Sequence, residues 1–467
     1  MLSILISDSG HLPNFWPNHK KFAECCRDVI SGLKKLILVH MLQLQGTMFI
    51  FNSFTGGVLE FHSLLGDSLF TKVLFFSALA IAIGDFLATL FTIVYQRYWY
   101  DRIMRPKYGA DFSPKCSVIV PCKGIPKDLG DNLKGFLQQD YADYEVIFVM
   151  ESEQDPAVPT IKSIMEGNPG VKLTYAGLST SCAQKNHNLL AALNSTSNPD
   201  IFVFADSDIR PAKGWLKELI LPLADPKVTV TSGFRWLHAC RGTTGELTHS
   251  YVNVFMYVLF SVACFFGGVG LWGGSMAIRR KDFEEMGVAE KWSRTAVDDM
   301  SLSQIVMKNS RKAVVVPPCI THTDDLLQTV RGTITWFERQ IMFLKAYQKS
   351  LWFFLAGPVS VVVFMLLFLL PFSIVASMSH SRSFLGIGGG AALVFYIGEL
   401  ITVSLYPLLG SMHKFPKFLI LQPYMRLAQV LSYFKTLMTN TITWAGIKYK
   451  LDFSGDVASI ERPGTDF

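Results

Sequence analysis

Asp206 and Asp208 stand one residue apart, directly after the apolar run Ile201–Ala205. That run is short, partly β-branched and preceded by a turn-like segment at residues 198–200, so we expect a buried strand. Two carboxylates this close repel each other unless a cation lies between them, and Mg²⁺ commonly bridges carboxylate to phosphate. The pair therefore predicts a metal site for a diphosphate. The simpler alternative is a solvated turn that begins a helix, because Asp and Ser are good N-caps.

The elements that would position these residues alternate between strand-like and helix-like patterns along residues 110–345. Strands are expected at residues 116–120, 144–150, 171–175, 201–205 and 228–232, and helices at 132–139, 157–166 and 183–192. Such alternation predicts a mostly parallel sheet flanked by helices. Ligands of open sheets bind beyond the carboxyl ends of the strands, so we expect the polar residues that follow the strands to meet at one edge.

Other polar residues fall at comparable places. Glu151 follows the second strand, Lys185 and Asn188 lie on the third helix, and Asp298 and Asp299 open a later helix. Acids at one sheet edge, together with a lysine, suit an activated sugar nucleotide. One acid can hold the nucleoside, a second the metal and diphosphate, and a third can take a proton from an attacking hydroxyl. For each residue the alternative is an ordinary solvated or capping position.

Composition indicates a membrane protein with one polar domain. The 467 residues are 50% hydrophobic and only 17% charged, against about a quarter in soluble domains. Three stretches, residues 73–94, 351–377 and 385–409, are long enough to cross a bilayer. Asp85 and Glu399 are their only charged residues and should face another helix or water. Three stretches of this length argue against helices of a soluble core.

Basic residues flank the expected spans on one side, which predicts a cytosolic location for residues 96–350 and for the C-terminal segment. The net charge of +6 suits an anionic membrane surface and an anionic substrate. The sequence lacks a basic stripe with interleaved aromatic residues, so it does not indicate binding to nucleic acid. The eight cysteines lack CxxC pairs and are expected to be free thiols.

The expected layout has five parts. An N-terminal extension at residues 1–68, whose first 47 residues lack signal-peptide features, precedes a transmembrane helix at 69–95. The α/β domain at 96–350 is followed by two transmembrane helices at 351–410 and by a C-terminal segment at 411–467. The stretch 418–438 is interrupted by Pro423, Arg426 and Lys435 and is expected to be an interfacial helix. Residues 251–269 form either a helix that dips into the membrane face or a buried core helix.

Five segments together resemble the ceramide glucosyltransferases, especially the plant-type branch, over roughly residues 70–450. They are residues 151–157 (ESEQDPA), 176–188 (AGLSTSCAQKNHN), 206–210 (DSDIR), 271–274 (LWGG) and 298–300 (DDM). The resemblance implies a GT-A domain, with a Rossmann-like, mostly parallel sheet. It also implies a divalent metal (Mg²⁺ or Mn²⁺) and inverting transfer of glucose from UDP-glucose to the primary hydroxyl of ceramide.

The resemblance also implies a role for each residue. Glu151 would lie near the uridine, and Lys185 and Asn188 near the nucleotide. Asp206 and Asp208 would hold the metal and diphosphate, although animal members keep only the first of these acids. Asp299 would be the catalytic base, with Asp298 as the alternative.

The last motif of the family, (Q/R)xxRW, is altered here to residues 336–340 (WFERQ), with Gln340 in the place of Trp. Arg339 would still contact the diphosphate, but an acceptor role for the missing Trp does not carry over. Residues 443–449 (TWAGIKY) resemble a C-terminal motif that closes over the active site.

Three alternatives stay open. The same chemistry could act on diacylglycerol, a sterol or a hopanoid, or use another UDP-sugar. A processive polysaccharide synthase would need more spans and an intact QxxRW motif. A non-catalytic lipid-binding membrane protein would not need acids at all three sites.

Overall fold

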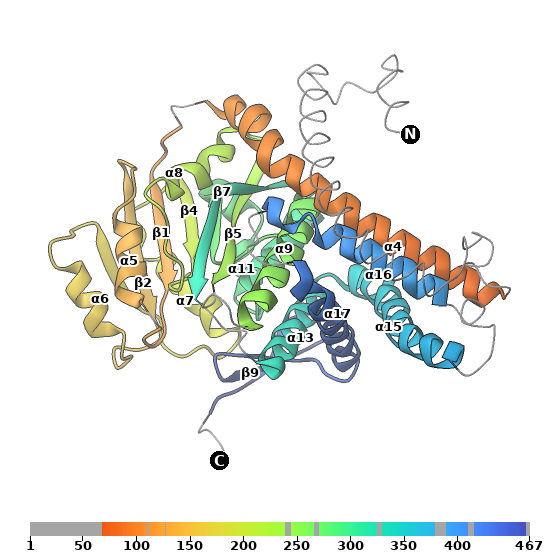
Figure 1. Ribbon diagram of the computed structural model, residues 1–467. Helices are drawn as coiled ribbons and strands as arrows, with labels where there is room; N and C mark the ends of the chain where they lie inside the picture. The colour runs from red at the N-terminus through yellow and green to blue at the C-terminus, as the bar shows by residue number, and fades with distance from the viewer. Residues whose placement is uncertain are drawn as a thin grey trace.

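The computed structural model describes residues 68–463 except 110–111, 127, 239–243, 266–269, 325–328, 379–388 and 410–414. Figure 1 shows an α/β body beside a group of long helices that includes α4 in orange and α15 to α17 in blue. The expected N-terminal extension, apart from Ser68, and the expected link between the second and third spans, apart from Met378, lie outside the described residues.

The body is built on a seven-stranded sheet with the order β3-β2-β1-β4-β6-β5-β7. Its first four strands are parallel: β1 (Cys116–Pro121), β2 (Tyr144–Met150), β3 (Val171–Tyr175) and β4 (Ile201–Ala205). The expected bounds of β2, β3 and β4 are confirmed to the residue, and β1 is one residue longer than expected. The prediction of a mostly parallel α/β sheet is confirmed.

The other half of the sheet departs from the expected pattern. β6 (Ser275–Arg279) was not predicted and runs antiparallel between β4 and β5 (Val228–His238). β5 extends six residues beyond the expected end at Ser232. β7 (Lys312–Asp324), also unpredicted, pairs in parallel with β5 at the edge of the sheet.

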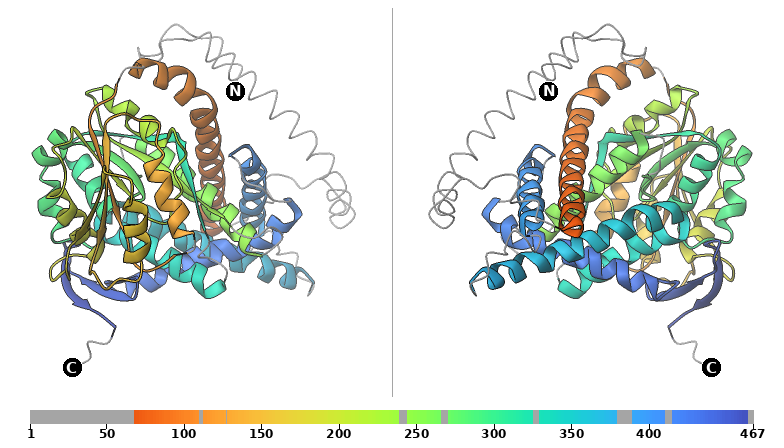
Figure 2. Two further views of the ribbon diagram at one scale, coloured as in Figure 1. Left: turned by 90° about the vertical axis from the view of Figure 1, so that its left-hand side faces the viewer. Right: turned by 90° about the vertical axis from the view of Figure 1, so that its right-hand side faces the viewer.

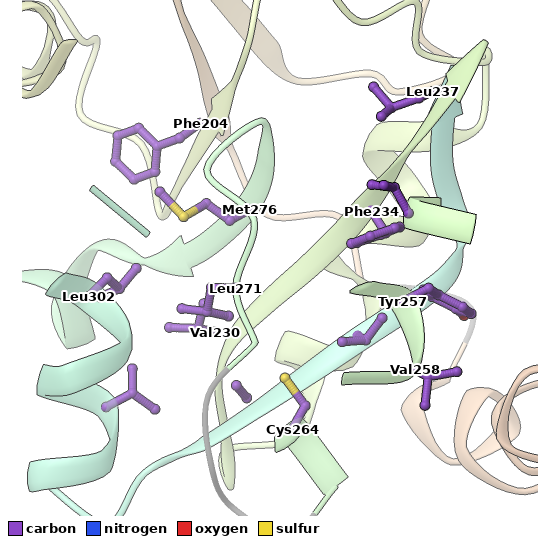
Figure 3. Packing of buried hydrophobic residues seen from close by; sticks show 14 of the residues in the cluster. Phe204, Val230, Phe234, Leu237, Tyr257, Val258, Cys264, Leu271, Met276 and Leu302 are labelled. Atoms are coloured by element: carbon purple, nitrogen blue, oxygen red, sulfur yellow. The ribbon is translucent and has the colours of Figure 1, made fainter. Parts of the chain in front are cut away.

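Helices cover both faces of the sheet. Successive strand residues point to opposite faces, so neighbouring residues of one strand pack against different helices. Val118 and Val203 pack with α5 (Leu129–Leu137), α6 (Val158–Met165) and α8 (Trp215–Ile220). Ile119 and Phe204 pack on the other face, which is covered by α7 (Gln184–Leu193), α9 (Thr244–Phe265) and α12 (Asp298–Lys308). Figure 3 shows part of this second cluster, where Phe204, Met276 and Leu302 lie near residues of β5 and α9.

Among the described residues, four helices are long and apolar enough to cross a membrane. They are α4 (Leu69–Val94, continuous with the turns up to Tyr108), α9, the helix Lys349–Val375 that contains most of α15 (Gly357–Met378), and the segment Gly389–Leu409 that contains α16 (Gly389–Val403). Three of them coincide with the expected spans. The fourth, α9, has Tyr251 and Tyr257 fully buried and packs on β5 and β7 as well as on α4. It therefore joins the sheet to the long helices.

The charged residues of the spans have partners. Arg426 of α17 (Phe415–Leu437) donates to Glu399 of α16 at 2.7 and 3.0 Å, and also to Asp85 of α4. Gln422 donates to Glu399 as well. The expectation that Asp85 and Glu399 face another helix is confirmed, and the three elements are tied together by one guanidinium.

The C-terminal segment completes the α/β body. α17 packs along α13 (Val330–Tyr347) and is followed by a small antiparallel sheet of β8 (Thr441–Trp444), β9 (Ile447–Leu451) and β10 (Val457–Glu461). Ile442 and Tyr449 of this sheet pack with Ala183, Val297 and Met342 in one buried cluster. Figure 2 shows these strands, in dark blue, beside the body and away from α4.

Candidate active site

The site forms where β4 ends and β6 begins. Ala205 pairs with Ser275, so the preceding Gly273 and Gly274 lie beside Asp206, whose backbone N–H donates to the Gly274 carbonyl at 3.2 Å. A Cβ atom on Gly273 would come within 2.3 Å of Asp298 Oδ2, and one on Gly274 within 2.7 Å of Asp206 Oδ2. Glycine fits both positions because the Asp298 carboxylate approaches Gly273, and the Trp272 ring, at 2.2 Å, approaches Gly274 even more closely than Asp206 does.

Lys185 of α7 connects the acids. Its ammonium lies 2.7 Å from Asp206 Oδ1 and 3.0 Å from Asp298 Oδ2, and donates to the Gly273 carbonyl at 3.3 Å. Burial opposes the charge of Lys185, but Asp206 and Asp298 outweigh it, so the pKa of the lysine is raised and it stays protonated. Residues from three separate segments thus meet at one cation.

Asp299 lies in the first turn of α12, next to this cluster. Its Oδ2 accepts a hydrogen bond from the Gly273 N–H at 2.9 Å, and its Oδ1 accepts one from the Met300 N–H at 2.6 Å. Burial, and then the charge of Asp298, raises the pKa of Asp299 to about 7, although Lys185 and the two backbone donors oppose the rise. A carboxylate with a pKa near neutrality is suited to general base catalysis.

The Asp208 side chain is suited to bind a metal ion. Its Oδ1 is buried and accepts no hydrogen bond within the described part of the chain. Burial, and then Asp206, raises the pKa of Asp208 to about 6. No group of three or more His, Cys, Asp or Glu side chains that could hold a metal occurs among the described residues. Two carboxylates together with substrate phosphates are a common Mg²⁺ site, so Asp206 and Asp208 fit a metal that arrives with a diphosphate.

Glu151 and Asn188 have partners outside the lysine cluster. Glu151 follows β2 and forms an ion pair with Lys123, beyond the end of β1, at 3.3 Å. Asn188 is buried and its Oδ1 accepts a hydrogen bond from Gln184 at 2.9 Å; Gln184 in turn donates to the Gly177 carbonyl. Asn188 therefore supports the loop before α7, and a nucleotide contact for either residue stays a prediction.

Arg339 of α13 faces a second arginine that the motifs did not indicate. The Nε atom of Arg339 is buried without an acceptor in the described residues. Burial, and then the charge of Arg235, lowers the pKa of Arg339 to about 10. Arg235 lies on β5, three residues past the expected end of that strand. The only sequence signal for it was a single cation in the run Phe234–Leu237, which was too weak to select it.

The C-terminal sheet covers the lysine. The Trp444 ring centre lies 5.6 Å from the Lys185 ammonium, and the Tyr449 hydroxyl accepts a hydrogen bond from the Gln184 N–H at 3.2 Å. The segment at residues 443–449 was expected to close over the site, and its position agrees with that expectation.

A cavity of about 1670 Å³ runs from Asp299 to the long helices. Asp299, Trp272 and Gln340 line it near the sheet, and Asp85 and Arg426 line it among the helices. Most of the wall between them is apolar and includes Phe255, Met256, Leu259 and Phe260 of α9 and Tyr433 of α17. The arrangement can place a long apolar molecule with one end at Asp299.

Comparison with known proteins places this site in a family. The sequence profile of glycosyl transferase family 21 matches residues 84–457. Ceramide glucosyltransferase 1 of Caenorhabditis elegans is 21% identical over 244 residues, which are 51% of this chain and 52% of that protein. The chain thus matches about half the length of this relative. Ceramide glucosyltransferase 3 of the same organism is 34% identical over 98 residues, 21% of each chain.

Among solved structures, the mannosyltransferase PcManGT from Pyrobaculum calidifontis, in complex with GDP-Man and Mn²⁺, aligns with a TM-score of 0.45 and 17% identity. The alignment covers 78% of this chain and 99% of that one. The profile match spans well over half of the chain and includes both the acid cluster and the long helices. The profile match covers most of the chain, and the chain belongs to glycosyl transferase family 21.

Proposed function

We propose that this protein is an inverting glucosyltransferase that moves glucose from UDP-glucose to the primary hydroxyl of ceramide. The observation that carries the proposal is the cavity, because it joins Asp299 to helices that are apolar enough to lie in a membrane. A ceramide in this cavity would keep its two chains among apolar side chains and present its hydroxyl to the acid. The family relatives named ceramide glucosyltransferase support the same acceptor.

The donor would lie across the carboxyl edge of the sheet. Glu151 is proposed to contact the uridine, Lys185 and Asn188 to lie near the nucleotide, and Arg339 to contact the diphosphate. A divalent metal, Mg²⁺ or Mn²⁺, held by Asp206 and Asp208 would neutralise charge on the diphosphate. Lys185 already lies 2.7 Å from Asp206 and would supply a second positive charge there.

The proposed reaction is a single displacement. The carboxylate of Asp299 takes the proton of the lipid hydroxyl, and the oxygen forms a bond to the anomeric carbon. The bond from that carbon to the β-phosphate oxygen breaks at the same time, and its electron pair leaves with UDP. Attack from the side opposite to the leaving group gives a β-glucoside. Asp298 holds Lys185 at 3.0 Å and is proposed to position it.

The basic residues around the spans support an integral membrane protein whose α/β domain faces the cytosol. The donor would then come from the cytosol and the acceptor from the adjoining leaflet. Accessibility of a cysteine introduced in the α/β domain, labelled in sealed vesicles with an impermeant maleimide, measures this orientation.

The test is transfer by purified full-length protein in lipid nanodiscs. Radiolabelled UDP-glucose with ceramide should give glucosylceramide and UDP in equal amounts, and the Asp299→Asn protein should give neither. Diacylglycerol, a sterol and a hopanoid in place of ceramide, and other UDP-sugars in place of UDP-glucose, test the alternatives within the same chemistry. Absence of UDP release with every pair would contradict a transferase and leave a lipid-binding protein.

A further inference from the structure

Two guanidinium groups from distant parts of the chain lie together at the edge of the site. The guanidinium carbon of Arg235 on β5 lies 5.9 Å from the ring centre of Trp336 on α13. Arg339 follows Trp336 by three residues, so both side chains lie on one face of that helix. Arg235 also lines the cavity beside Trp272 and Asp299.

Neither arginine has a counter-ion in the described part of the chain. No ion pair within 4.0 Å involves Arg235 or Arg339, and the buried Nε of Arg339 lacks an acceptor. Like charges held together in a partly buried place are unfavourable unless an anion joins them. Guanidinium groups bind phosphate oxygens through two parallel hydrogen bonds, which makes phosphate the best-matched anion.

The strand register places this pair at the diphosphate end of the site. Arg235 pairs with Thr321 of β7, and Ile209, next to Asp208, forms a bridge with Thr323 two residues further along the same strand. The register therefore places the backbone of Asp208 near that of Arg235, at the same end of β7.

We infer that Arg235 and Arg339 jointly bind one phosphate group, and that the occupant is the sugar-bearing phosphate of the nucleotide donor. This rests on the proposed function. The other source of a phosphate in this position is an acceptor lipid with a monophosphate head group. Titration with UDP and titration with a lipid monophosphate distinguish the two sources.

The test is calorimetric titration of the full-length protein in detergent, with metal present, using UDP and UMP as probes. Arg235→Gln and Arg339→Gln should each raise the Kd for UDP at least about tenfold and leave the Kd for UMP within about twofold, because UMP lacks the second phosphate. The loss of UDP affinity in the double variant should be smaller than the product of the losses in the two single variants, since both groups bind one phosphate. Arg235→Lys should retain part of the affinity. Arg331→Gln, an exposed residue of the same helix, is the matched control and should match the wild type.

Stability separates a binding role from a folding role. Removal of one of two facing charges should leave the Tm of the ligand-free protein unchanged or higher, while the increase in Tm on addition of UDP becomes smaller. An unchanged Kd for UDP in Arg235→Gln would overturn the inference and leave the proposed function intact. Unchanged UDP affinity with weaker binding of a lipid monophosphate would also overturn it and assign the pair to the acceptor. Failure of the wild type to bind UDP would instead contradict the proposed function.

Discussion

Two groups of charged side chains, one among the long helices and one at the sheet edge, differ in how completely they are paired. Among the long helices, Arg426 donates to both Asp85 and Glu399, and Glu399 also accepts from Gln422. At the sheet edge, Lys185 is paired with Asp206 and Asp298, but Asp208 Oδ1 and Arg339 Nε lack hydrogen-bond partners in the described residues. Every charge of the first group has a charged partner, whereas the second group contains charged side chains with unpaired atoms.

The difference shows what each group is built to do. A paired charge cluster in an apolar setting holds helices in a defined arrangement, and loss of one member leaves the others buried and uncompensated. Unpaired buried groups destabilise a fold, so they are retained where a ligand supplies the partner. Changes at the sheet edge should therefore affect binding and turnover, and changes among the helices should affect stability.

The largest effect is expected for Asp299→Asn. The amide cannot accept the proton of the lipid hydroxyl, so kcat should fall by about a thousandfold or more. The variant keeps the size of the side chain and should bind UDP within about threefold of the wild type, since the proposed diphosphate site lies toward Asp206. Product formation in nanodiscs and calorimetric UDP titration measure the two quantities. Weaker UDP binding with residual turnover would remove Asp299 from the role of base.

Arg426→Met should produce the largest loss of stability. It leaves the buried carboxylate of Glu399 and the partly exposed carboxylate of Asp85 without their cation. The loss at Glu399 should cost about 3–5 kcal/mol of the free energy of unfolding. Unfolding in mixed micelles, followed by tryptophan fluorescence, measures the change.

The triple variant Asp85→Ala, Glu399→Leu and Arg426→Met is the matched control, because it removes the whole cluster. It should recover most of the lost stability. An Arg426→Met protein as stable as the wild type would show that the cluster of Arg426, Asp85 and Glu399 does not hold the helices together.

Asp206→Asn should weaken metal-dependent binding of UDP by at least about tenfold, because it removes one carboxylate from the proposed metal site. Titrations of UDP with Mg²⁺ and with EDTA separate the metal-dependent part. With EDTA, the variant and the wild type should differ much less. Asp131→Asn, at an exposed position, is a control with the same change of charge. If the Asp206→Asn protein binds UDP with wild-type affinity in Mg²⁺, the metal binds elsewhere.

The smallest expected effect is a pH dependence. The pKa of Asp299 is raised to about 7, and a base acts only in its deprotonated form. The value of kcat/KM should therefore be constant above pH 7 and fall about tenfold per unit below it. Initial rates from pH 5.5 to 8.5 test this; a profile that stays flat down to pH 5.5 would assign the base to a group of lower pKa.

The strands that carry the site could be predicted from their local pattern. β2, β3 and β4 are apolar runs bounded by turn residues, and each pairs in parallel with its neighbour. β7 contains Pro317 and Pro318, which argue against a strand. It is nevertheless a strand because it lies at the sheet edge, and its register with β5 shifts between Ser232 and Phe234 at the level of these prolines.

The sequence by itself determined which helices are apolar enough for a membrane and which acids follow buried strands, because both depend on residues near each other in the chain. It also indicated that Asp85 and Glu399 need a partner. Only the tertiary structure decided that the partner is Arg426, 341 residues from Asp85, and that one lysine serves both Asp206 and Asp298. The position of Arg235 beside Arg339 depends on how a sheet edge packs against a later helix. Such contacts arise from the packing of distant segments, and no local pattern of residue types encodes them.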